Sequence, residues 1–199
     1  MVWRSFWYWS VMSGMLKIFT TQLQGVFNRI AGSEEFAFED GARLLAQAAV
    51  GDGRIYVHGV KEMKAIEAEA TDGAEPLGSA KLLSDLDSYH DLTDTDRALI
   101  VSRFSTDEEA VKTAKALKEL GIEVVGISTV IAPVDGTEPG TGVVESLENL
   151  VDVHIDMKLK KPLIPGDDGE RFGFPSSMTA LYVYYGLAFT LREMLEEQE

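Results

Sequence analysis

A continuous apolar run followed by an amphipathic helix constrains this chain more than any other feature. Residues 98–101 (Ala-Leu-Ile-Val) hold no polar side chain, which is typical of a strand buried on both faces of a sheet. A helical pattern follows, with Ala110, Ala114 and Leu117 on one face, and residues 123–127 then form another β-type run. Because two strands joined by a helix form a parallel βαβ unit, the sequence predicts an α/β protein.

The rest of the chain repeats this alternation of strands and helices. Further β-type runs occupy residues 54–58, 80–83 and 151–155. Apolar residues at helical spacing predict helices over residues 15–31, 38–49 and 60–70, near residues 143–150, and from Pro175 onward. Gly- and Pro-rich stretches predict loops at residues 129–142 and 158–174. We therefore expect a three-layer α/β sandwich, with a five-stranded parallel sheet in the order 2-1-3-4-5.

The first fourteen residues differ from the regular text that follows them. They hold all three tryptophans, lack the pattern of a secretory signal, and are too short to span a bilayer. The segment could be an interfacial membrane patch, an oligomerisation strand, or an extension upstream of a natural start at Met15. We favour the last interpretation because a regular amphipathic helix begins at Met15. The predicted organisation is an extension over residues 1–14 and a single domain over residues 15–199.

Composition excludes several classes of function. The chain has 33 acidic and 18 basic residues, a net charge of −15, which argues against nucleic acid as the main partner. It has no cysteine, so disulfides, thiolate nucleophiles and Cys-ligated metals are ruled out. The three histidines, His58, His90 and His154, are scattered and argue against a His-rich metal site. We expect a cytoplasmic protein with no cofactor, no metal and no membrane contact.

The predicted topology places the ligand crevice between the first and third strands. In open α/β sheets the crevice lies beyond the carboxyl ends of the strands, where the strand order reverses. The loops that leave these two strands are residues 59–62 and residues 102–106. Each leads into a helix N-terminus, where free N–H groups favour an anion. Lys61, Lys64 and Arg103 are expected to add positive charge there.

Each of these features also has a simpler structural interpretation. Ser105 and Glu108 have the spacing of a capping box, with Ser105 as the N-cap of the following helix. A serine at this position is usually only a cap, and a surface lysine is usually only solvated. Their convergence on one edge of the sheet nevertheless predicts a site for a phosphate or sugar phosphate.

From Leu16 to its C-terminus the chain resembles the sugar isomerase (SIS) domain family. The resemblance rests on IYVHGVKEMKAIEAEA, on DRALIVSRFSTDEEAVKTAKALKELGIEVVGIS, and on PSSM before the last helix. It implies homodimers that bind phosphosugars at the carboxyl edge of a five-stranded sheet. More narrowly, the chain from Met15 resembles small bacterial SIS-like proteins described as phosphoheptose isomerases.

The chain departs from two motifs of that family. After the first strand the family places G-x-G-x-S, and here Gly59 fits while Lys61 and Met63 replace the second glycine and the serine. After the third strand it places S-x-S-G-x-T, and here Ser102 fits while other residues stand at the remaining motif positions, namely Phe104, Ser105 and Asp107. Phe104 removes a phosphate donor and Asp107 adds repulsion. The expected ligand-binding residues are Gly59, Lys61, Ser102, Arg103, Ser105, Thr106, Ser176 and Ser177.

The candidates for chemistry are weaker. Aldose–ketose isomerisation needs a base that moves a proton between neighbouring carbons, and Glu62 and His58 flank Gly59 at the expected edge. Glu62 is also a suitable first-turn acid for the helix dipole, and His58 is also a suitable structural residue. Two functions therefore stay open. One is a protein that binds and isomerises a phosphorylated sugar or related carbohydrate derivative, and the other is an inactive ligand-sensing or protein-interaction module.

Overall fold

Five parallel strands form the centre of the molecule. The computed structural model describes residues 3–131 and 145–197. The sheet has the order β2-β1-β3-β4-β5, and every neighbouring pair in it is parallel. The predicted fold class and strand order are therefore confirmed. The strands are β1 (Ile55–Gly59), β2 (Ala80–Leu82), β3 (Arg97–Phe104), β4 (Glu123–Thr129) and β5 (Val153–Asp156).

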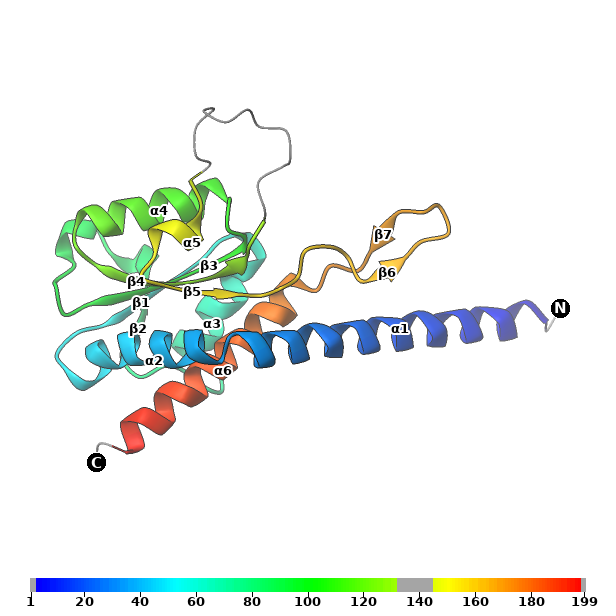
Figure 1. Ribbon diagram of the computed structural model, residues 1–199, viewed down its shortest axis with the longest axis horizontal. Helices are drawn as coiled ribbons and strands as arrows, with labels where there is room; N and C mark the ends of the chain where they lie inside the picture. Colours follow the sequence, from blue (N-terminus) through cyan, green and yellow to red (C-terminus); the bar gives the residue numbers. More distant parts are fainter. Residues whose placement is uncertain (1–2, 132–144, 198–199) are drawn as a thin grey trace.

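Helices cover both faces of this sheet (Figure 1). On one face lie α1 (Trp3–Ser33), α2 (Glu35–Val50), α3 (Lys64–Asp72) and α6 (Ser176–Glu196). On the other lie α4 (Glu108–Glu119) and α5 (Leu147–Leu150). The connections contain three short 3₁₀ helices, η1 (Lys61–Met63), η2 (Leu83–Asp85) and η3 (Tyr89–Asp91). A small antiparallel hairpin, β6 (Ile164–Pro165) with β7 (Arg171–Phe172), precedes α6.

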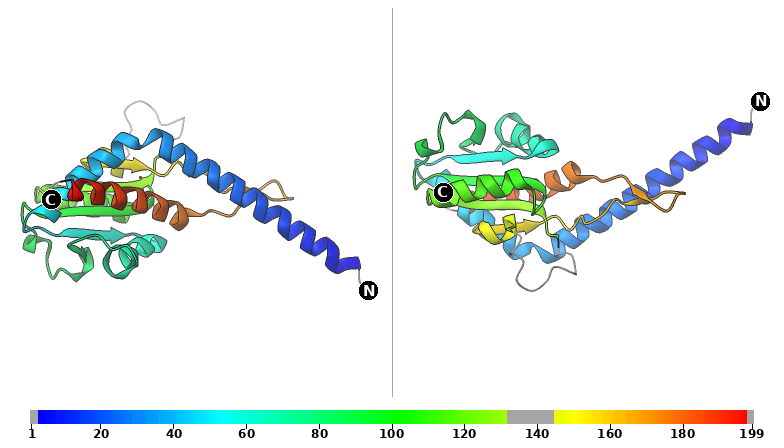
Figure 2. Two further views of the ribbon diagram at one scale, coloured as in Figure 1. Left: turned by 90° about the horizontal axis from the view of Figure 1, so that it is seen from below. Right: turned by 90° about the horizontal axis from the view of Figure 1, so that it is seen from above.

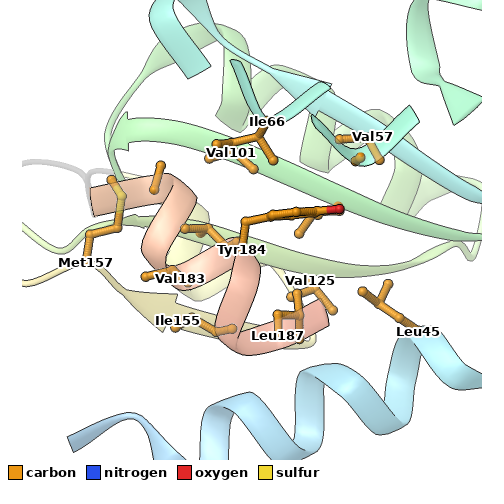
Figure 3. Packing of buried hydrophobic residues seen from close by; sticks show 14 of the residues in the cluster. Leu45, Val57, Ile66, Val101, Val125, Ile155, Met157, Val183, Tyr184 and Leu187 are labelled. Carbon is orange, nitrogen blue, oxygen red and sulfur yellow. The ribbon is translucent and has the colours of Figure 1, made fainter. Parts of the chain in front are cut away.

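The larger part of the core lies between the sheet and the pair α2 and α6. Figure 3 shows Leu187 of α6 near Val125 of the sheet. A Cβ on Gly41 of α2 would lie 3.2 Å from Leu187 and 3.5 Å from Val125, so glycine permits the close approach of helix and sheet there. Tyr184 of α6 is fully buried in the same layer, and its hydroxyl donates to the Glu75 carbonyl at 2.6 Å. The predicted packing role of Tyr184 is confirmed.

The first helix is longer than its pattern predicts. The expected helix spans residues 15–31, but α1 runs from Trp3 to Ser33 without a break at Met15. Figure 2 shows its N-terminal part projecting past the rest of the molecule. The side chains of residues 1–13 lie outside the described part of the chain. That residues 1–14 contribute nothing to the core stays a prediction.

Three smaller boundaries also differ from the sequence expectation. The strand that begins with residues 98–101 continues through Phe104, so residues 102–104 are strand and not a turn. The expected loop over residues 158–174 contains the β6–β7 hairpin. Most of the expected loop over residues 129–142 lies outside the described residues, which resume at Glu145.

Several large apolar side chains stay exposed on the outer helices. Leu16 of α1 is 66% exposed, and Ile18 of α1 and Phe189 of α6 are exposed as well. A second copy of the chain would cover such residues, and the expected homodimer stays a prediction. Among the described residues, no helix combines the length and apolarity that crossing a membrane requires.

Candidate functional site

The loops after β1 and β3 lie side by side, as the topology predicts. Gly59 is paired with Val101 in the parallel register, and the Val60 N–H donates to the Val101 carbonyl at 2.9 Å. The chain then folds back sharply into η1. A Cβ on Gly59 would lie 2.3 Å from the Met63 carbonyl oxygen, so only glycine fits at the end of β1.

Lys61 occupies a backbone conformation that glycine favours. Its φ of +56° lies in the left-handed region, and this is the position where the SIS motif has its second glycine. The Lys61 ammonium lies 3.0 Å from Oδ2 of Asp107, which follows β3. The first of the two expected cations is therefore paired with an acid across the crevice.

Arg103 is paired across the crevice in the opposite direction. Its Nε donates to Glu62 Oε1 at 2.7 Å, and the Ser176 hydroxyl donates to the same oxygen at 2.8 Å. The hydrogen bond from Arg103 is the main reason that the pKa of Glu62 falls to about 2. Three elements, η1, β3 and α6, thus meet at one carboxylate oxygen.

These pairs correct the expected electrostatics of the crevice. The sequence predicts a positive spot from Lys61 and Arg103, but each cation faces a carboxylate from the other loop. Glu62 and Asp107 therefore neutralise the two charges. We define these four residues as the crossed pairs: Lys61 with Asp107, and Arg103 with Glu62. They remain in contact with water, since the side chains of Arg103 and Glu62 are 45% and 30% exposed.

Two aromatic rings form the apolar wall beside Arg103. The rings of Phe104 and Phe174 pack edge to face with centroids 5.7 Å apart, and the Arg103 guanidinium lies 5.8 Å from the Phe174 centroid. Phe174 comes from the segment that leads into α6. Sequence reasoning missed it, because no local pattern relates residue 174 to the end of β3.

The start of α4 differs from the predicted capping box. Asp107 is the N-cap, and its side chain accepts the Glu109 N–H at 3.2 Å, so the assignment of Ser105 as N-cap is wrong. The reason is the longer strand: β3 continues past a register shift between Val101 and Phe104, which moves the helix start toward the C-terminus. Ser105 is fully buried, and among the described residues its hydroxyl has no hydrogen-bond partner.

The other expected hydroxyl groups differ in accessibility. Ser102 is fully buried, and its hydroxyl donates to the Phe104 carbonyl at 2.9 Å, which stabilises the loop. Thr106 is exposed and Ser177 is half-buried. Ser176 is buried and is bound to Glu62. A ligand in the crevice would meet Thr106, Ser177 and the crossed pairs before it meets Ser102 or Ser105.

His58 lies close to the crevice but faces two acids. Its Nδ1 is 3.8 Å from Glu67, and its Nε2 is 3.5 Å from Glu109. The buried Nε2 has no hydrogen-bond partner within the described ranges. Glu67 accepts the Gly59 N–H at 2.8 Å, so it holds the end of β1 in place. Sequence reasoning missed this role, although a helix following a glycine turn returns its first acids toward the strand.

A second polar cluster lies at the same edge of the sheet, beyond β4 and β5. The Lys158 ammonium lies 2.6 Å from Glu34 and 3.1 Å from Asp156, and Glu34 also accepts the Asp156 N–H at 3.1 Å. Nearby, the Ser128 hydroxyl and His154 Nε2 are 2.7 Å apart, and burial lowers the pKa of His154 to about 4. We call Glu34, Asp156 and Lys158 the buried triad. No group of acids and histidines in the described ranges has the arrangement of a metal site.

Comparison with known proteins adds one family and one fold. The family described as "Domain of unknown function (DUF2529)" matches residues 15–195. A relative from Bacillus subtilis (strain 168), "Uncharacterized protein YwjG", is 45% identical over 183 residues, which cover 92% of this chain and 99% of the relative. Neither name assigns an activity.

Solved structures share the fold at low sequence identity. The E. coli CFT073 protein c3406 in complex with arabinose 5-phosphate aligns with a TM-score of 0.69 and 16% identity, over 94% of this chain and 93% of that one. The Vibrio vulnificus NanR protein complexed with ManNAc-6P aligns with a TM-score of 0.62 and 14% identity, over 92% of this chain and 64% of that one. The SIS fold expected from the resemblance is confirmed, and the narrower likeness to phosphoheptose isomerases stays a prediction.

Proposed function

The chain belongs to the DUF2529 family, and for this member we propose that the crevice between β1, β3 and α6 binds a phosphorylated sugar or a related carbohydrate derivative. One observation carries the proposal: Arg103 and Ser176, from separate elements, donate to a single oxygen at the ligand edge of the sheet. That geometry suits an oxyanion, because a guanidinium binds carboxylate and phosphate oxygens alike. The sugar phosphates bound to c3406 and to NanR support the class of ligand.

The accessible and the buried residues of the crevice have different roles in this proposal. Arg103, Thr106, Ser176, Ser177 and Lys61 contact the phosphate group. Gly59, Ser102 and Ser105 shape the loops that present these donors, since the first permits the sharp turn and the two serines are buried. With fewer free hydroxyls than the SIS motif provides, the site binds its phosphate more weakly than a full serine–threonine loop would.

The state of Glu62 favours a sensing role over catalysis. A general base works best when its pKa is near the working pH, and hydrogen bonding to Arg103 holds the pKa of Glu62 at about 2. Glu62 is therefore a weak base for moving a proton between sugar carbons. His58 is the remaining candidate base. The second candidate function is thus a ligand-sensing module that binds the sugar phosphate without converting it.

The proposal is tested by ligand-dependent thermal stability. The ligands of the two aligned structures, arabinose 5-phosphate and ManNAc-6P, are titrated against the full chain, with the corresponding sugars lacking phosphate as controls. A bound ligand at 100 times its dissociation constant adds about 2.7 kcal/mol to the free energy of unfolding. Arg103→Ala and Ser176→Ala should abolish most of this gain, whereas Arg192→Ala, which removes an exposed arginine at the far end of α6, should keep it. Equal gains in all variants would place the ligand elsewhere.

The two candidate functions are then separated by turnover. The sugar phosphate that stabilises the protein most is incubated with it, and aldose–ketose conversion is followed by proton exchange at the carbon next to the carbonyl. Binding without exchange is expected from the state of Glu62. Exchange that disappears in His58→Gln but persists in Glu62→Gln would instead identify an isomerase with His58 as its base.

A further inference from the structure

Glu62 occupies the place in the crevice where a ligand anion would be bound. The Glu62 Oε1 atom accepts from Arg103 Nε at 2.7 Å and from the Ser176 hydroxyl at 2.8 Å. These are the two donors with the clearest geometry for an oxyanion. A donor already engaged by one negatively charged oxygen must release it before it can bind another equally well. A carboxylate and a phosphate therefore compete for the same two groups.

The contacts of Glu62 make an exchange with a ligand feasible. The Arg103–Glu62 pair is partly exposed, and exposed ion pairs contribute only about 0–1 kcal/mol to stability. Glu62 lies on η1, a 3₁₀ helix of three residues, next to Lys61 with its left-handed backbone. By contrast, Arg103 lies on the central strand β3 and Ser176 begins the long helix α6. The acid is thus on the least supported of the three elements.

We infer that Glu62 is a built-in competitor of the phosphate group, which holds Arg103 and Ser176 until an anionic ligand displaces its carboxylate. This inference rests on the proposed function, because it names the residue that sets the ligand affinity of that site. It gives the acid a regulatory role: Glu62 lowers the occupancy of the crevice by weak anions and leaves it to ligands with further contacts. Its removal should therefore tighten binding, which is the opposite of what removal of a ligand-positioning residue would do.

The test compares two variants that change the net charge equally. Glu62→Gln removes the competing charge and keeps the shape of the side chain. Glu196→Gln removes the charge from the exposed Arg192–Glu196 pair at the other end of α6 and is the matched control. Inorganic phosphate and ManNAc-6P are titrated calorimetrically into the wild-type protein and into both variants. Loss of one competing charge-assisted hydrogen bond corresponds to about a tenfold lower Kd for Glu62→Gln.

Two further measurements separate competition from a structural effect. In the double variant Glu62→Gln/Arg103→Ala the tenfold gain should vanish, because the donor that was released is now absent. In the wild-type protein, the NMR resonance of the Arg103 Nε–H group should shift on addition of ManNAc-6P as its acceptor changes from carboxylate to phosphate. The Arg192 Nε–H resonance should not move.

The possible outcomes distinguish the inference from the proposed function. Tighter binding by Glu62→Gln alone supports both. Binding by the wild-type protein that is unchanged or weaker in Glu62→Gln overturns the inference and leaves the proposed function intact. A stationary Arg103 resonance during binding overturns the inference as well. Failure of every protein to bind either probe overturns the proposed function and the inference together.

Discussion

Two groups of ion pairs lie at the same edge of the sheet, and they differ in burial. The crossed pairs at β1 and β3 face water, with Lys61 68% exposed and Arg103 45% exposed. The acids of the buried triad at β4 and β5, Glu34 and Asp156, have side chains only 10% and 12% exposed. Burial makes an unpaired charge costly, whereas water replaces a lost partner at the surface. The difference indicates that one end of the edge maintains the fold and the other is free to exchange partners with a ligand.

The buried triad also has a clear structural task. Glu34 lies between α1 and α2, and its carboxylate accepts the N–H of Asp156 at the end of β5. Asp156 in turn accepts the N–H groups of Val130 and Lys158. The triad therefore fixes the junction of the first two helices to the outermost strand, and it orders the chain on either side of that strand.

The largest expected effect concerns the pH dependence of the β4–β5 region. Burial holds the pKa of His154 at about 4 in the fold, against about 6.5 in the unfolded chain. Between these values the unfolded chain binds the extra proton, so the free energy of unfolding falls as the pH is lowered from about 6.5 to about 4. The loss amounts to about 3 kcal/mol, since each pKa unit is worth about 1.4 kcal/mol.

Urea unfolding of His154→Gln at pH 7 and pH 4 isolates this contribution from that of the carboxylates. The variant should lose about 3 kcal/mol less than the wild-type protein over that interval. His90→Gln, which changes an exposed histidine, should behave like the wild type. Parallel pH curves for all three proteins would show that His154 titrates normally and that this end of the edge is not dry.

The second effect breaks the buried triad itself. Glu34→Ala leaves the Asp156 N–H without its acceptor and removes one partner of Lys158. We expect a loss of about 2 kcal/mol in the free energy of unfolding, less than for a fully buried pair because Lys158 keeps Asp156. Glu39→Ala, on the exposed face of α2, is the matched control and should change stability by less than about 0.5 kcal/mol. Equal losses from both variants would contradict the structural role of the triad.

The sequence predicts the layers of this molecule better than its polar contacts. The apolar residues 98–101 and the face of Ala110, Ala114 and Leu117 report burial directly, because burial is what selects their type. The strand order follows from general rules of α/β topology, and it places the ligand edge correctly. Fold and edge were therefore predictable from one sequence.

The pairing of charges was not predictable in the same way. Glu34 and Asp156 are 122 residues apart, and no local pattern relates them. Glu62 and Arg103 were identified separately, one as a helix-dipole acid and the other as a free cation, but their pairing depends on the exact ends of β1 and β3. The extension of β3 to Phe104 also moved the start of α4, so Asp107 and not Ser105 caps that helix. Errors of two residues at an element boundary thus change which side chains meet.

The smallest expected effect completes the comparison at the crevice. Arg103→Ala removes one ion pair and the contact with the Phe174 ring, both at an exposed side chain. Each interaction contributes about 0.5 kcal/mol at such a site, so the free energy of unfolding should fall by less than about 1 kcal/mol. Arg192→Ala, which removes a similarly exposed pair from α6, provides the matched baseline in the same urea titration. A loss for Arg103→Ala as large as that for Glu34→Ala would mean that the crossed pairs hold the crevice loops together, and Glu62 could not then be displaced by a ligand at the modest cost that competition requires.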